Sequence, residues 1–150
     1  MSHTNSFKAL SAALIFAFFS LAANAENTKD LLKIALKKQA PKNVVSLLNN
    51  LPYNQEPLPK TVLYAKFDLN NDKRKEYILL AYDASWCGAS YCPIFIFQIK
   101  GKHKKILLEA NSDPEIHILR HRTKGYHDIA FYPETETDRY IWHWNGKQYK

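Results

Sequence analysis

The stretch Asp83–Phe97, with the sequence DASWCGASYCPIFIF, decides how the chain is organised. It contains both cysteines, one of the three tryptophans and the most apolar run outside the N-terminus. Its last residues alternate isoleucine and phenylalanine, a composition that favours a strand with both faces covered. We therefore expect a central strand over Pro93–Ile99, with a constrained loop before it.

The two cysteines, Cys87 and Cys92, lie five positions apart. In an exported protein such a pair most simply forms one disulfide. On chain-entropy grounds a loop of this size stabilises the fold by about 2 kcal/mol. Its main effect is local, because it holds the residues Trp86–Tyr91, which we call the knuckle, in one conformation. The spacing matches neither a redox-active pair nor a zinc ligand set, which disfavours both alternatives.

The first 25 residues have the pattern of a secretory signal peptide. Lys8 is followed by an apolar run over Ala9–Ala22 and by Ala23-Asn24-Ala25, a small-x-small cleavage site. A membrane anchor is disfavoured, because the run is short for a hydrocarbon core of about 30 Å. We expect cleavage after residue 25, a single domain over residues 26–150, and a periplasmic or extracellular location without a membrane span.

The chain is basic, with a formal net charge of +7 that falls to +6 when Lys8 is removed with the leader. A basic surface favours anionic partners such as phospholipid head groups or acidic glycans, and export disfavours nucleic acid. The alternative is that the charge only keeps a small domain from associating. The basic runs, Lys73–Lys75 and Lys102–Lys105, are short, which favours this alternative.

Helical patterns occupy the beginning of the expected domain. Asn27 or Thr28 can cap a helix, and Leu31–Leu36 has apolar residues at helical spacing. A second short helix is expected over Pro41–Asn50.

From Thr61 onward the pattern becomes typical of strands, with turn signals between them. The expected strands are Val62–Phe67, Glu76–Tyr82, Pro93–Ile99, Lys105–Leu108, Glu115–His121, Asp128–Tyr132 and Arg139–Trp144. The sequence thus predicts an α+β fold, with two N-terminal helices packed on a mainly antiparallel meander sheet of about six or seven strands.

An acidic loop precedes the second expected strand. Oxygen ligands recur at Asp68, Asn70, Asp72 and Glu76, with the backbone carbonyl of Arg74 between them. A hard cation such as Ca²⁺ requires six to eight oxygens, which such a loop can supply in part. The alternative is a hairpin loop whose side chains bond its own backbone. We expect no cofactor other than this calcium ion.

The order of the motifs resembles a family of small exported bacterial proteins, mostly of unassigned function. These proteins combine an Asp-rich loop similar to those of FG-GAP and VCBS-type repeats with a G-x-x-x-C-P segment, G-Y-x-D-[LI] and a terminal W-[DN]-G-x-x-Y. The resemblance covers about Phe67 to Tyr149. The loop departs from the FG-GAP and VCBS pattern at Lys73, where that pattern has glycine, and Glu76 falls one residue later than in its simplest form. It implies an exported β-rich domain and no reaction.

Aromatic side chains are the candidate binding residues. They are Trp86 and Tyr91 in the knuckle and Tyr140, Trp142 and Trp144 near the C-terminus. The last three alternate, so in a strand they share one face. If that face is outward it forms a binding stripe, and if it is inward it belongs to the core.

Polar residues offer weaker candidates for chemistry. His117, His121 and His143 could share neighbouring strand positions and bind zinc, with scattered surface histidines as the alternative. A small cell-wall or glycan hydrolase would need a carboxylate acid or base, for which the candidates are Asp83, Asp128 and Glu134.

These observations favour a monomeric, non-enzymatic binding protein that recognises a protein or cell-envelope partner. An inhibitor of a lytic enzyme is one version, because a rigid loop loses little entropy on binding. The alternatives are the hydrolase and a calcium-stabilised accessory domain.

Overall fold

The computed structural model describes residues 31–36, 39–52, 57–112, 114–131 and 140–150. In these ranges the chain forms one short helical segment, α1 (Lys42–Val45) continued by the 3-10 turn η2 (Ser46–Asn50), and eight strands. The strands are β1 (Leu31–Ala35), β2 (Val62–Phe67), β3 (Glu76–Ala81), β4 (Cys92–Lys100), β5 (His103–Ser112), β6 (Glu115–Thr123), β7 (Tyr126–Phe131) and β8 (Tyr140–Trp142). The expected signal peptide and helix cap lie outside the described residues.

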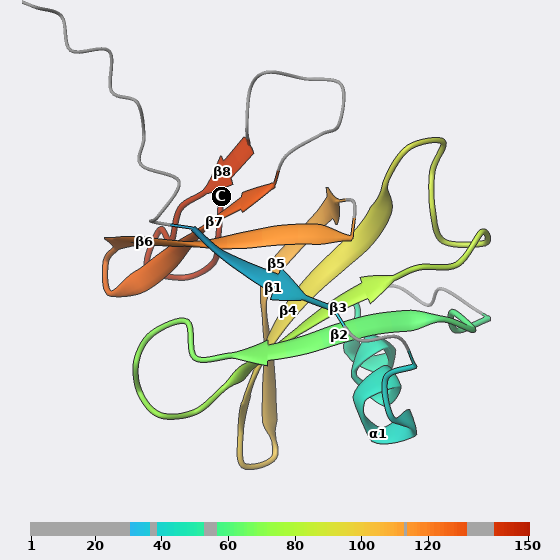
Figure 1. The fold of residues 1–150 in the computed structure, drawn as a ribbon. Coiled ribbons are helices and arrows are strands. Elements are labelled where there is room, and N and C mark those ends of the chain that lie inside the picture. The colour runs from blue at the N-terminus through green and yellow to red at the C-terminus, as the bar shows by residue number, and fades with distance from the viewer. Residues whose placement is uncertain (1–30, 37–38, 53–56, 113, 132–139) are drawn as a thin grey trace, which may run out of the picture.

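The strands form two four-stranded antiparallel sheets (Figure 1). One has the order β2-β3-β4-β5 and is a simple meander, whereas the other has the order β1-β6-β7-β8. The expected α+β class is therefore wrong, because the described chain is mostly antiparallel β and its strands divide between two sheets. The chain passes from one sheet to the other between Ser112, the last residue of β5, and Glu115, the first residue of β6.

The first of the two expected helices is wrong as well. Leu31–Ala35 is strand β1, which pairs with β6 so that Leu31 lies opposite Leu119 and Ala35 lies opposite Glu115. A nearly continuous apolar run suits a strand as well as a helix, and pairing with a distant strand decides between them. The second expected helix, over Pro41–Asn50, corresponds to α1 and η2.

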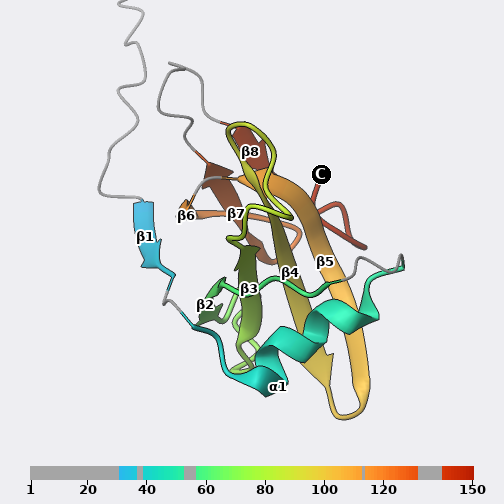
Figure 2. The same ribbon diagram turned by 90° about the vertical axis from the view of Figure 1, so that its right-hand side faces the viewer.

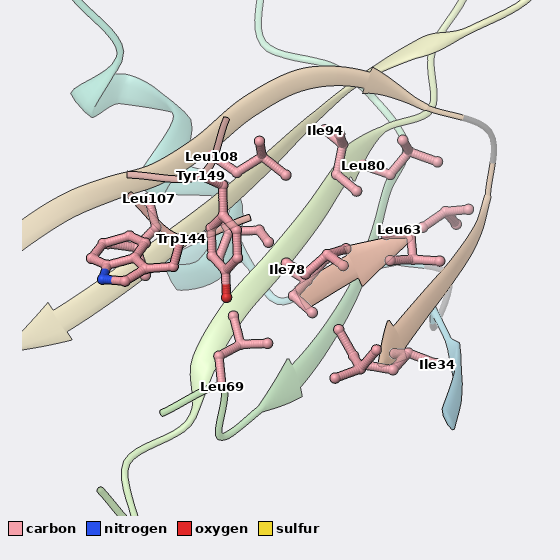
Figure 3. Packing of buried hydrophobic residues seen from close by; sticks show 14 of the residues in the cluster. Ile34, Leu63, Leu69, Ile78, Leu80, Ile94, Leu107, Leu108, Trp144 and Tyr149 are labelled. Carbon is pink, nitrogen blue, oxygen red and sulfur yellow. The ribbon is translucent and has the colours of Figure 1, made fainter. Parts of the chain in front are cut away.

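The β2–β5 sheet is covered on both faces. Successive side chains along its central strands point alternately into one core and into the other. Ile78, Leu80, Ile94 and Ile96 point into a core shared with the other sheet, part of which appears in Figure 3. Leu79, Ala81, Phe95 and Phe97 point into a second core closed by α1 and η2, and Figure 2 shows the helix lying across this face. This double cover confirms the expectation for the strand over Pro93–Ile99, which is β4, and β3 is covered in the same way.

A buried polar network joins the two sheets. Glu76, 1% exposed, accepts hydrogen bonds from the backbone N–H of Leu69 at 2.9 Å and from Nε2 of Gln98 at 3.1 Å. The hydroxyl of Tyr126, at the start of β7, accepts bonds from Nε2 of Gln98 and Nδ2 of Asn70. Burial raises the pKa of Glu76, while the bonds from Leu69 and Gln98 act in the opposite direction.

The C-terminal segment extends the contact between the sheets. The N–H of Tyr149 donates to the carbonyl of Leu107 on β5, and its hydroxyl donates to the carbonyl of His127 on β7, both at 2.8 Å. Trp144, 5% exposed, stacks on Tyr126 with ring centroids 4.2 Å apart. These contacts place the C-terminal segment, residues 144–149, between β5 and β7.

The Glu76 network makes a testable contribution to stability. Glu76→Ala leaves the Leu69 N–H and the Gln98 amide without their acceptor, so we expect a loss of about 2–3 kcal/mol in the free energy of unfolding. Gln98→Ala should cost less, and the double variant should show a coupling energy of about 1 kcal/mol. Urea denaturation of all four proteins measures this, and strictly additive effects would contradict the network.

Candidate functional site

The knuckle between β3 and β4 is held by covalent and polar contacts. Cys87 and Cys92 form the expected disulfide, with Cα atoms 4.1 Å apart. The carboxylate of Asp83 accepts bonds from the backbone and hydroxyl of Ser85 and from the backbone N–H of Lys60. These bonds, that from the Ser85 hydroxyl first, lower the pKa of Asp83. The loop therefore has one defined shape.

Trp86 anchors the knuckle from inside. Its side chain is 6% exposed, its Nε1 donates to the carbonyl of Pro57 at 2.9 Å, and its ring meets Phe95 edge-on. The structure thus places this candidate binding residue in the core beneath the helix. Trp144 is also buried, against Tyr126. Both tryptophans therefore pack in the interior, Trp86 against Phe95 and Trp144 against Tyr126.

The other three candidate binding residues gather around one ring. The ring of Tyr91 meets the ring of Phe131, on β7, edge-on, with centroids 5.3 Å apart. The rings of Tyr140 and Trp142 stack on Phe131, with centroid distances of 5.9 Å and 6.0 Å. Tyr140 is 53% exposed, while Tyr91 and Trp142 are half-buried. The disulfide loop of one sheet and the edge strand of the other therefore form a continuous aromatic surface.

A pocket of about 310 Å³ adjoins this surface. It is lined by residues 87–91 of the knuckle, by Cys92 and by residues 82–84. Tyr82 is 47% exposed, and among the described residues it and Tyr140 are the exposed large apolar side chains. We call Tyr82, Tyr91, Tyr140 and Trp142 the aromatic surface. Tyr82, which belongs to this surface, and Phe131, the buried ring beneath it, were not singled out from the sequence, since neither belongs to a recognisable pattern.

A larger hollow, of about 590 Å³, runs along β5. Its lining consists of residues 106–111 of β5 together with Pro93, Gln148 and Tyr149. The N–H of Tyr149 is bonded to the β5 carbonyl of Leu107 here. The hollow therefore lies between β5 and the C-terminal segment, and none of the candidate residues lines it.

The acidic loop binds its own backbone. The Asp68 carboxylate accepts bonds from the N–H groups of Asp72 and Lys73, and Asp72 accepts one from Arg74. Lys73 has φ 69°, a left-handed conformation that suits the glycine of the resembling loops. Glu76 faces the interior network. The loop thus has the geometry of the hairpin alternative, and calcium binding stays a prediction.

The structure brings two histidines onto one buried carboxylate. Oδ2 of Asp128 lies 2.5 Å from Nδ1 of His121 and 2.9 Å from Nδ1 of His143, and it accepts a bond from the Thr123 hydroxyl at 3.1 Å. Asp128 is fully buried and its Oδ1 has no hydrogen-bond partner among the described residues, whereas both imidazoles are largely exposed. His117, the third zinc candidate, instead lies 3.0 Å from Glu115.

This cluster orients two imidazoles on one buried carboxylate. Burial opposes the charge of Asp128, yet the bonds from His121, Thr123 and His143 outweigh it and hold its pKa below the usual value. Neither imidazole is bonded through Nε2 to another described residue. Across the described ranges, no three His, Cys, Asp or Glu side chains are placed to hold a metal ion.

Comparison of the chain with protein-family models, with curated proteins and with solved structures finds no match. Within the part that the structure describes, none of the helices has the length and apolar composition to cross a bilayer.

The Asp128 cluster predicts an acid-sensitive contribution to stability. Because the folded pKa lies below the unfolded value of 3.8, the contribution is complete above that value and is lost as the pH falls through the folded pKa. Asp128→Asn should therefore destabilise the protein by about 1–3 kcal/mol near neutral pH.

Urea denaturation of both proteins across the acid range measures this difference, which should shrink toward about pH 3. Asp83→Asn is the matched control, because that carboxylate also has a lowered pKa but lies in a partly exposed turn. If the stability difference between Asp128→Asn and the wild type did not change with pH, the acid-sensitive contribution assigned to Asp128 would be contradicted.

Proposed function

We propose that the protein is an exported, non-enzymatic binding protein that recognises a protein or cell-envelope partner through the aromatic surface. The observation that carries this proposal is the convergence of Tyr91, Tyr140 and Trp142 on Phe131, beside the knuckle pocket. Tyrosine and tryptophan offer large apolar areas with polar tips and few rotatable bonds, which is why they dominate binding surfaces.

The rigidity of the knuckle supports the same function. The disulfide, the Asp83 turn and the buried Trp86 each hold the loop on which Tyr91 stands. A loop already ordered in the free protein loses less conformational entropy when a partner binds, so more of the contact energy appears as affinity.

The compartment is part of the proposal. The Cys87–Cys92 disulfide is compatible with an oxidising location outside the cytoplasm. The leader pattern of residues 1–25 supports export by the secretory route. The positive charge of the chain favours a partner that is not itself strongly basic, which limits the inhibitor version to enzymes of suitable charge.

The hydrolase alternative has less support from the geometry. A catalytic carboxylate must reach the substrate, but Asp128 is fully buried and the oxygens of Asp83 are engaged by Ser85 and Lys60. Glu134, the third candidate, lies outside the described residues.

The binding proposal is tested by affinity capture with the exported protein, using envelope and medium extracts and mass spectrometry. A partner retained by the wild type should be weakened about tenfold or more by Tyr91→Ala with Tyr140→Ala, because both rings leave the surface. Tyr140→Phe is the matched control, since it keeps the ring on Phe131. A partner that binds the alanine variant as tightly as the wild type contradicts this surface as the binding site.

The disulfide should matter more for binding than for folding. Replacing Cys87 and Cys92 by serine should lower the free energy of unfolding by about 2 kcal/mol. With the knuckle no longer closed, affinity for a captured partner should fall even where the variant is fully folded. Calorimetric titration below the melting transition measures this. Equal affinity for the two proteins would exclude the rigid knuckle from recognition.

A further inference from the structure

Two basic turns lie at the same end of the β2–β5 sheet. One, Lys73–Lys75, leads into β3, and the other, Lys100–Lys105, joins β4 to β5. Because β3 and β4 are antiparallel with Tyr77 opposite Phe97, the beginning of β3 and the end of β4 are neighbours. The knuckle lies at the other end of these strands, and Figure 2 shows the two ends apart.

At this end of the β2–β5 sheet, exposed lysine and arginine side chains outnumber the carboxylates. No acidic residue occurs between Gln98 and Leu108. Asp68 and Asp72 are engaged with backbone N–H groups of their own loop, and Glu76 is buried. We call the following exposed side chains the basic end: Lys73, Arg74, Lys75, Lys100, Lys102, Lys104 and Lys105.

The two turns are close enough to act as one charged surface. The pKa of Asp72 is lowered first by the bond from the Arg74 N–H, and the positive charge of Lys100 contributes from the neighbouring turn. The Nζ of Lys105 lies 5.4 Å from the ring centroid of Trp144, in the C-terminal segment. The basic end therefore spans both turns and reaches the C-terminal segment.

The type and placement of these cations favour a flat anionic partner. Six of the seven residues are lysines, which act as mobile point charges and lack the planar fork that recognises one carboxylate or phosphate. They lie in the two turns or in the strand residues next to the β4–β5 turn, and neither described pocket is lined by any of them. Diffuse lysine charge on a protruding end matches the charge density of an anionic lipid surface.

We propose that the basic end docks the protein on an anionic phospholipid surface. Each lysine held near such a surface strengthens binding by about fivefold, so several together give reversible association without insertion of apolar side chains. Because the knuckle lies at the other end of β3 and β4, a protein docked in this way presents its aromatic surface away from the lipid.

The test is co-sedimentation of the exported protein with vesicles. Vesicles of phosphatidylglycerol with phosphatidylcholine should bind it at low ionic strength, and vesicles of phosphatidylcholine alone should not. Raising the salt from about 0.05 M to about 0.5 M should release it, because screening weakens exposed charges. Lys102→Glu with Lys104→Glu should reduce binding at least about tenfold.

The matched control is Lys42→Glu with Lys60→Glu, which removes the same charge from exposed positions outside the two turns. This variant should keep binding within about threefold of the wild type, as long-range charge is screened. Equal losses in both variants, or equal binding to neutral vesicles, would overturn the proposal. So would tighter binding to a soluble polyanion such as polyphosphate, with no sedimentation with vesicles, since the partner would then be an acidic polymer.

Discussion

A single carboxylate placed between the two sheets, that of Glu76, is the interaction on which the other contacts depend. Moving a charge out of water costs several kcal/mol unless hydrogen bonds replace the lost hydration. Here the replacement comes from the N–H of Leu69 and the amide of Gln98, and the same amide binds the hydroxyl of Tyr126. The acidic loop, β4 and β7 must therefore take up their positions together, which fixes how one sheet sits on the other.

The central strands β3 and β4 give the molecule two chemically different ends. At one end they meet the polar network and the lysine-rich turns, and at the other they meet the disulfide and the aromatic rings. Between these ends the strands are buried on both faces, so they form a stiff connection. Exposed groups at both ends are thus held at a constant separation, which suits a protein that binds two surfaces at once.

Local chemistry was enough to predict β2 and β3 closely, because each is a short, mainly apolar run bounded by turn residues. It failed at Leu31–Ala35, where the partner strand β6 is far away in sequence and no local signal reveals it. The placement of the aromatic residues could likewise be predicted only in part. Tyr140 and Trp142 share a face as predicted, but the strand ends at Trp142, and Trp144 turns inward to bridge with Tyr149. The pairing of His121 with Asp128 depends on an irregularity in β6 that the sequence does not reveal.

The pairing of β1 with β6 has a consequence for the order of folding. The strands β2 to β5 are joined by short connections, so they can pair as soon as they are made, whereas β1 must wait until Leu119 is available. Closing so long a loop costs entropy that is recovered only when both strands are in place. The edge of β6 that pairs with β1 therefore stays open until this long loop closes, at a stage when β2 to β5 can already have paired.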